Sequence, residues 1–159
     1  MRTVIVCASV SHGNTRRVAD SMARVLGAEV VSPERADPAE LAGADLVGFG
    51  SGVFYGRLHP RLTGFVKALP PGRGRAFVFA TRGLPATPPA PFARPVVRLL
   101  EAKGFEVEGT FSCRAFDTWA PFKLVGGINK ERPDAGDLAA ARAFAGRLRL
   151  RQDGRGPAS

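Results

Sequence analysis

Short, almost wholly apolar runs recur along the chain, and such runs are typical of parallel strands buried on both faces. The last of them is longer and carries charged residues at alternate positions, as expected of a strand nearer the edge of a sheet. The pattern predicts five strands: Thr3–Ala8, Ala28–Val31, Asp45–Gly50, Arg75–Ala80 and Phe105–Cys113.

Between these runs, apolar residues recur at the spacing of an amphipathic helix. Val18, Met22 and Leu26, for example, share one helical face. Asp37 and Pro38 have the types that favour an N-cap and a first helical position. Helices are expected over Asn14–Leu26, from Pro38, from Pro60 to Leu69, from Pro95 to Gly104, and after a cap at Asp134.

This alternation predicts an α/β fold, a doubly wound parallel sheet with helices on both faces, because parallel strands need right-handed helical crossovers. Residues 1–150 are expected to form one domain and the polar residues 151–159 a disordered tail. In such sheets ligands bind beyond the carboxyl ends of the strands, where the strand order reverses. The candidate loops therefore follow Ala8, Gly50, Ala80 and Cys113.

The charge of the chain is unevenly distributed. The formal net charge is +9, and residues 51–100 hold eight basic and no acidic residues. Such a segment either attracts an anionic surface over a long range or reflects an arginine-rich composition alone. The first reading predicts a partner with an acidic surface, either a protein or an anionic membrane face. Nucleic acid is not expected, because no recognition motif is present.

The chain shows neither a membrane span nor a targeting segment. The longest apolar runs are far shorter than the roughly 20 residues that cross a bilayer. The N-terminus lacks the three parts of a signal peptide, which are a charged region, a long apolar region and a cleavage site. A cytoplasmic location is therefore expected.

The loop after the first strand has the composition of an anion site. Ser9, Ser11 and Thr15 offer hydroxyl groups around Gly13, and the loop leads directly into a helix. Backbone N–H groups and the helix dipole favour an anion at such a terminus. Small polar residues also serve as ordinary caps, but the position after the first strand favours phosphate binding.

Several other sites are excluded. The chain has no GxxxxGK[ST] motif, and Val53 replaces the last glycine that a GxGxxG motif would need. A low-molecular-weight phosphatase loop starting at Cys7 would need arginine where Gly13 stands. No group of His, Cys, Asp and Glu has metal-ligand spacing, so no metal ligand is assigned. No catalytic residue is assigned either.

Ser11-His12-Gly13-Asn14-Thr15 resembles the phosphate loop T-x-T-G-N-T of the flavodoxin family. Val10 and His12 differ from the hydroxyl residues usual there, so Ser9 could replace one donor. The segment GSGVFYG, from Gly50 to Gly56, resembles the family's second FMN loop. Residues 116–119 (FDTW) and 126–130 (GGINK) resemble a segment of small flavodoxin-like proteins of bacteria and archaea.

The resemblance covers essentially the whole chain. It implies a five-stranded parallel sheet of order 2-1-3-4-5 and bound FMN. The implied cofactor-binding residues are Ser9, Ser11, His12, Gly13, Asn14, Thr15, Ser51, Gly52, Val53, Phe54, Tyr55, Gly56, Thr81, Arg82, Gly83 and Trp119.

Some of these residues have two readings. Phe54 and Tyr55 either stack on the flavin ring or pack internally. Arg82 either stabilises negative charge on the reduced flavin or is solvated. Trp119 either covers the site or plugs the edge of the sheet. Cys113 is either a redox group or a small buried hydrophobic residue.

The implied function also has two classes. The lack of a nicotinamide-binding domain favours an electron carrier between redox partners. Tyr55-Gly56-Arg57-Leu58-His59 resembles a string in flavodoxin-like protoporphyrinogen oxidases, although His59 before Pro60 also suits a helix cap. The alternative is therefore an FMN-dependent oxidoreductase acting on a quinone or a protoporphyrinogen-type substrate. A binding module that has lost its flavin is a third reading.

Overall fold

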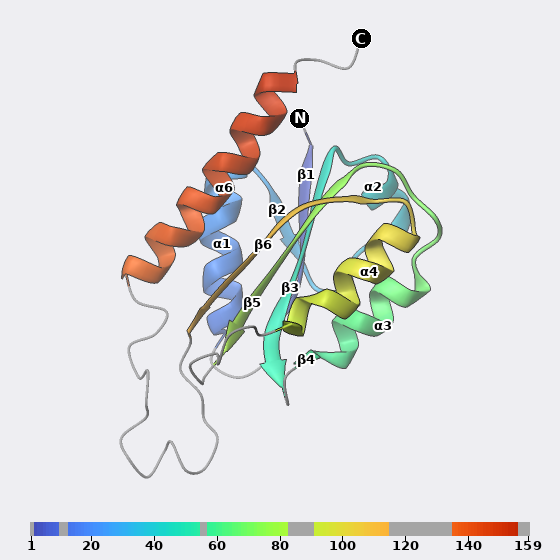
Figure 1. The fold of residues 1–159 in the computed structure, drawn as a ribbon, viewed down its shortest axis with the longest axis horizontal. Coiled ribbons are helices and arrows are strands. Elements are labelled where there is room, and N and C mark those ends of the chain that lie inside the picture. Colours follow the sequence, from blue (N-terminus) through green and yellow to red (C-terminus); the bar gives the residue numbers. More distant parts are fainter. Residues whose placement is uncertain (1, 10–12, 55–56, 83–90, 115–134, 156–159) are drawn as a thin grey trace.

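A parallel sheet lies at the centre of the computed structural model, which describes residues 2–9, 13–54, 57–82, 91–114 and 135–155. The strand order is β2-β1-β3-β5-β6 (Figure 1). This is the predicted order 2-1-3-4-5, since the fourth and fifth predicted strands are β5 and β6. The bounds are β1 (Thr3–Ala8), β2 (Glu29–Val31), β3 (Leu46–Phe54), β5 (Arg75–Arg82) and β6 (Glu106–Arg114).

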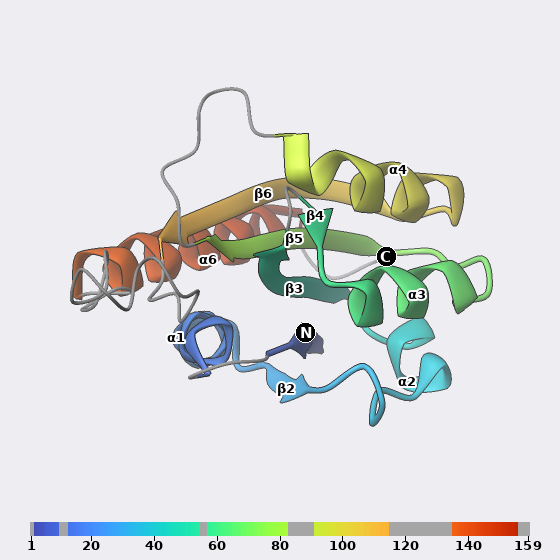
Figure 2. The same ribbon diagram turned by 90° about the horizontal axis from the view of Figure 1, so that it is seen from below.

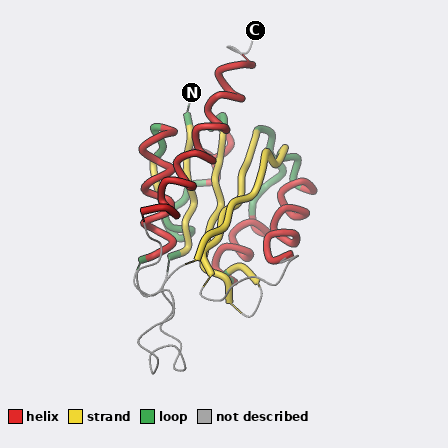
Figure 3. The backbone as a smooth tube through the Cα atoms, turned by 60° about the vertical axis from the view of Figure 1, so that its left-hand side comes forward, coloured by secondary structure: helices red, strands yellow, loops and turns green. Residues whose placement is uncertain are grey.

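Helices cover both faces of the sheet, as predicted (Figures 2 and 3). One face is covered by α1 (Asn14–Leu26) and α6 (Ala135–Arg155). The other is covered by α2 (Pro38–Ala42), α3 (Pro60–Ala68) and α4 (Arg94–Ala102), and a 3₁₀ turn, η1 (Pro91–Ala93), precedes α4. Asp37 caps α2 as predicted, because its Oδ1 accepts a hydrogen bond of 2.9 Å from the Ala39 N–H.

The core follows the alternation of side chains along each strand. Ile5 and Cys7 of β1 pack toward α1 and α6, whereas Val4 and Val6 pack toward α3 and α4. All six residues of β1 are buried, as expected of a central parallel strand.

The prediction for the end of the third strand was wrong in its boundary. Residues beyond Gly50 were assigned to a loop, but β3 runs to Phe54. Ser51 and Gly52 continue the parallel pairing with β5, and Val53 and Phe54 then pair antiparallel with β4 (Arg57–Leu58). The glycine-rich segment therefore extends the sheet before the chain turns.

The prediction of a disordered tail from residue 151 was also wrong in its boundary. Helix α6 continues to Arg155, and Gln152 is only 7% exposed. The predicted cap Asp134 and residues 156–159 lie outside the described residues. Among the helices that are described, none has both the length and the apolar character needed to cross a membrane.

Candidate functional site

The carboxyl ends of the strands meet at one edge of the sheet. Ala8 of β1 lies opposite Ser51 of β3, which lies opposite Ala80 of β5, and Thr81 lies opposite Cys113 of β6. The strand order reverses at β1, because β2 lies on one side of it and β3 on the other. The ends of β1, β3 and β5 thus meet at the position where ligands bind in doubly wound sheets.

The N-terminus of α1 has local features that favour an anion. Its N-cap, Gly13, has φ 66° and ψ 22°, a left-handed conformation that glycine adopts without strain. Gly13 has no side chain that could cap this terminus, and the first turn carries no acidic residue. The N–H groups of a first helical turn need acceptors from outside the helix, and the helix dipole makes an anion favourable there.

A buried hydroxyl group lies in the same loop without a partner. Within the described residues, Ser9 Oγ makes no hydrogen bond although it is shielded from solvent. A buried polar atom of this kind carries a free-energy cost until it acquires a partner. The residues present therefore fit a ligand that brings hydrogen-bonding oxygens to this edge, as a phosphate would.

The first and third loops are joined by a pair of threonines. Thr15 Oγ1 and Thr81 Oγ1 lie 2.7 Å apart in a buried hydrogen bond. Thr15 is in the first turn of α1 and Thr81 is near the end of β5. This contact fixes the N-terminus of α1 relative to the end of β5, so it positions the candidate anion site. Asn14, beside Thr15, is also buried.

The Ser51 hydroxyl anchors the start of the second loop through two hydrogen bonds. It donates to the Gly52 carbonyl at 2.8 Å and accepts from the His59 N–H at 2.9 Å. Ser51 is fully buried, whereas Gly52 and Val53 are half-buried. The hydroxyl of Ser51 therefore ties the β3 end to the start of α3.

Arg82 ends β5 with part of its guanidinium buried. Its Nε and one terminal nitrogen have no hydrogen-bond partner within the described residues. The guanidinium carbon lies 5.9 Å from the centre of the Phe92 ring, within cation–π range. A partly desolvated cation without an anionic partner is costly, so Arg82 adds a second unsatisfied group that a negatively charged ligand would stabilise.

His59 caps α3, which confirms the structural reading of this residue. Its Nδ1 accepts a 3.0 Å hydrogen bond from the Arg61 N–H. Burial, with a smaller effect of the Arg61 charge, lowers the pKa of His59 below the ordinary value of 6.5. Arg61 is itself held by both carboxylate oxygens of Glu34, at 2.5 and 2.6 Å. His59 is therefore neutral near pH 7 and serves as a hydrogen-bond acceptor.

Both cysteines are buried free thiols. Burial raises the pKa of Cys7 to about 12, so its thiol stays protonated and unreactive near neutral pH. Cys113 packs in the core on the α1 and α6 side of the sheet. Among the described residues, no group of three His, Cys, Asp or Glu side chains gathers in a way that could hold a metal ion.

The structure describes little of the remaining candidate cofactor-binding residues. Phe54 is placed at the end of β3, without a described side chain. Ser11, His12, Tyr55, Gly56, Gly83 and Trp119 lie outside the described residues.

Sequence reasoning missed Phe92, which contacts Arg82. It lies among prolines, far from any recognised motif, and no local signal distinguishes it from a packing residue.

Fold and site together define a class of protein. It is a doubly wound α/β protein with a helix N-terminus that favours an anion at the point where the strand order reverses. The family model of the flavodoxin domain matches residues 5–88, and the chain belongs to this family. It is 34% identical over 145 residues to the uncharacterized protein MJ0298 of Methanocaldococcus jannaschii, covering 91% of this chain and 96% of that protein.

Solved structures of low sequence identity share the fold. A flavodoxin from the domain Archaea has a TM-score of 0.69 at 16% identity, covering 93% of this chain and 96% of the other. The flavodoxin of Streptococcus pneumoniae TIGR4 has a TM-score of 0.69 at 16% identity, covering 95% and 99%. A Lactobacillus acidophilus flavoprotein in complex with FMN has a TM-score of 0.55 at 15% identity, covering 70% and 92%.

Proposed function

We propose that this protein binds FMN noncovalently at the carboxyl edge between β1 and β3 and carries electrons between redox partners. The observation that carries the proposal is the N-terminus of α1, which begins at a glycine and has no acidic residue in its first turn, beside the unpartnered Ser9 hydroxyl. Membership of the flavodoxin family supports the choice of FMN among phosphate-bearing ligands. So does the FMN complex of a protein with the same fold.

Different residues at the carboxyl edge of the sheet would hold different parts of the cofactor. Ser9 and the first turn of α1 would hold the phosphate, in an orientation fixed by the Thr15–Thr81 hydrogen bond. Gly52 and Val53 would flank the ring on the second loop, which Ser51 ties down. Arg82 would supply positive charge at the end of β5. FMN, when bound, supplies reversible electron transfer.

The carrier function needs binding groups but no general acid or base. Within the described parts of the four loops, the site offers hydroxyls, backbone groups and guanidinium groups, and no carboxylate. His59, the residue that suggested an oxidoreductase acting on a quinone or protoporphyrinogen-type substrate, is used as a helix cap. These observations favour the carrier over the enzyme.

The partner in this proposal presents an acidic surface. Residues 51–100, which contain the second and third loops, hold no carboxylate. Opposite charge speeds the encounter of redox proteins and orients them. The cytoplasmic location remains a prediction from the sequence.

FMN titration of a matched pair of variants tests the binding site. Ser9→Ala removes the unpartnered hydroxyl at the carboxyl end of β1. Thr3→Val removes another unpartnered buried hydroxyl, at the opposite end of the same strand. We expect Ser9→Ala to raise the Kd for FMN about 5- to 150-fold, roughly 1–3 kcal/mol for a charge-assisted hydrogen bond. Thr3→Val should leave the Kd unchanged.

Three results would count against the proposal. Absence of FMN binding by the unaltered protein would remove the cofactor assignment, and equal effects of the two variants would remove the site. Rapid NAD(P)H oxidation with a quinone, without any added reductase, would replace the carrier with an enzyme.

A further inference from the structure

A groove of about 890 Å³ lies between α3 and α4, beside β4 and η1. Its floor is apolar and is formed by Leu58, Phe92, Val96 and Leu99. Leu58 and Val96 are buried, whereas Phe92 and Leu99 are half-buried and available to an incoming apolar group. In size the groove reaches the upper part of the range typical of ligand sites, about 300–1,000 Å³.

The walls of this groove are positively charged. Arg57, Lys67, Arg94 and Arg98 line it, and all four are exposed. None of them forms an ion pair within the described chain, although arginines elsewhere do. No acidic residue in the described part of the chain lines the groove, so these cations repel one another without compensation from those residues.

The spacing of these cations suits an extended ligand rather than a point anion. Arg94 and Arg98 are one helical turn apart on α4, as are Thr63 and Lys67 on α3. Like charges at this spacing destabilise a helix by a few tenths of a kcal/mol. Carboxylates spaced along a docked segment would relieve the repulsion between Arg94 and Arg98 on α4 and would pair with Lys67 on α3.

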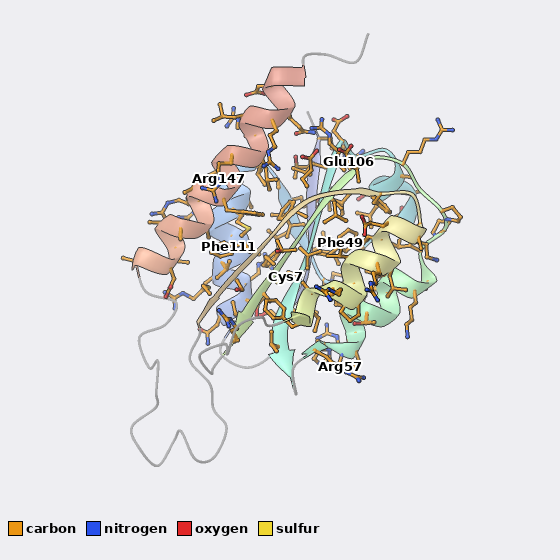
Figure 4. The ribbon with its side chains drawn as sticks, viewed as in Figure 1. Cys7, Phe49, Arg57, Glu106, Phe111 and Arg147 are labelled. Carbon is orange, nitrogen blue, oxygen red and sulfur yellow. The ribbon has the colours of Figure 1, made fainter. Side chains whose placement is uncertain are left out.

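The groove adjoins the proposed cofactor site. Phe92 lines the groove and also contacts the guanidinium of Arg82, which ends β5. Leu58 lines the groove and pairs with Val53 at the end of β3. Figure 4 shows Arg57 at this same end of the molecule, by β4 and the first turns of α3 and α4. A segment held in the groove would therefore lie next to the second and third loops.

We propose that the α3–α4 groove is the docking site for an acidic segment of a partner protein that carries apolar side chains between its carboxylates. A hollow with an apolar floor fits a protruding segment better than the flat face of a membrane. That this partner is a redox protein rests on the proposed function; the docking itself does not. The groove is a peripheral surface and is separate from the residues assigned to the cofactor.

Binding of labelled peptides to the FMN-loaded protein tests this proposal by fluorescence anisotropy. The probe is a helical peptide with Glu at every fourth position and Leu between. Its matched controls carry Lys in place of Glu, or Ser in place of Leu. We expect the first peptide to bind, the Lys peptide not to bind, and the Ser peptide to bind more weakly because it leaves the apolar floor uncovered.

A pair of charge-reversal variants localises the binding. Arg94→Glu with Arg98→Glu should weaken binding at least tenfold. Arg24→Glu with Arg142→Glu makes the same change of net charge at exposed positions on α1 and α6, across the sheet, and should alter it less than twofold. The milder pair Arg94→Gln with Arg98→Gln should give an intermediate loss, and circular dichroism verifies that each variant is folded.

Each outcome decides one of the two proposals. Equal losses in both charge-reversal variants, or no binding of the acidic peptide, would overturn the docking site. Binding of phosphatidylserine vesicles through Arg94 and Arg98, without binding of the peptide, would replace the protein partner with a membrane. If the unaltered protein fails to bind FMN but still binds the acidic peptide, the proposed function is refuted and the docking site stands.

Discussion

At the scale of single residues, the buried polar groups of the carboxyl edge fall into two classes. The hydroxyls of Ser51, Thr15 and Thr81 are engaged within the protein and shape the loops. Ser9 and Arg82 instead hold buried polar atoms without partners. Because unsatisfied buried groups are costly, the second class marks where a ligand adds stability. The first class marks what keeps those groups in place.

The capping role of His59 gives a pH dependence that can be measured. Its folded pKa is lowered below 6.5, so its contribution to stability is present above pH 6.5 and is lost as the pH falls through the lowered value. His59→Asn keeps a capping acceptor that does not titrate. Near pH 7.5 the two proteins should have similar unfolding free energies in urea. Near pH 5 the unaltered protein should be less stable than the variant by about 1 kcal/mol, the value of one N-cap.

The other titrating groups do not obscure this comparison. Hydrogen bonding to Arg61 holds the pKa of the Glu34 carboxyl at about 2, so that carboxylate stays ionised over this range. His12 is present in both proteins, so a difference between the two curves comes from position 59. Parallel pH profiles for the two proteins would show that His59 does not control the cap.

At the scale of elements, β3 is shaped by its neighbour β5. Gly50 lies opposite Phe79, and a Cβ at Gly50 would come within 2.1 Å of the Phe79 ring. Gly48 is placed in the same way beneath Phe77. The glycines of this strand thus make room for aromatic rings that pack toward α1 and α6. Their presence near the second loop is explained by packing in the core.

We expect Gly50→Ala to lower the unfolding free energy by about 1–3 kcal/mol or more, because overpacked cores force rings and backbone to shift. Gly64→Ala in α3 is the control, since nothing lies within 4 Å of a Cβ there. Alanine is favoured over glycine inside a helix, so this control should gain about 0.5–1 kcal/mol. Urea unfolding measures both.

A background carrying Phe79→Leu identifies the cause of that loss. If the ring is the obstacle, Gly50→Ala should cost less in this background, since contacting residues are energetically coupled. An unchanged cost would place the strain elsewhere.

Elements with a strong local pattern were predictable, and contacts between distant elements were not. The wholly apolar β1 and the periodic α1 matched their predicted bounds. The end of β3 was missed because Gly50-Ser51-Gly52 has the composition of a turn, and the pairing that makes it a strand comes from β5 and β4. The last turns of α6 were missed because Gly154 and its polar neighbours carry no helical pattern.

In the candidate site, too, local motifs were predictable and contacts between distant residues were not. Motif and position located the first loop, but the Thr15–Thr81 hydrogen bond joins residues 66 positions apart in the chain. The contact of Arg82 with Phe92 likewise depends on how η1 lies beside β5. Neither has a signal in the spacing of residues.

At the scale of the whole molecule, charge is sorted between the two ends of the sheet. Figure 4 shows Glu106 and Arg57 at opposite ends. Beside Glu106 on β6, the buried carboxylate of Glu108 lies 3.4 Å from Arg75 and 3.6 Å from Arg151. At the carboxyl end, Arg57, Arg94 and Arg98 have no such partners in the described chain. Of these arginines, the three at the end that would expose the flavin thus lack a counter-charge in the described chain.

This asymmetry predicts how electron transfer depends on salt. The Debye length falls from about 30 Å at 0.01 M to about 10 Å at 0.1 M ionic strength, so steering by exposed charges weakens over that range. In stopped-flow experiments, the rate with an acidic ferredoxin should fall steeply as salt rises, whereas the rate with a basic cytochrome should increase. Arg57→Glu should slow the reaction with ferredoxin several-fold at low salt without changing the Kd for FMN. Arg142→Glu, with the same change of charge on α6, should have a smaller effect. A salt-independent rate, or equal effects of the two substitutions, would mean that the arginines reflect composition and do not select the partner.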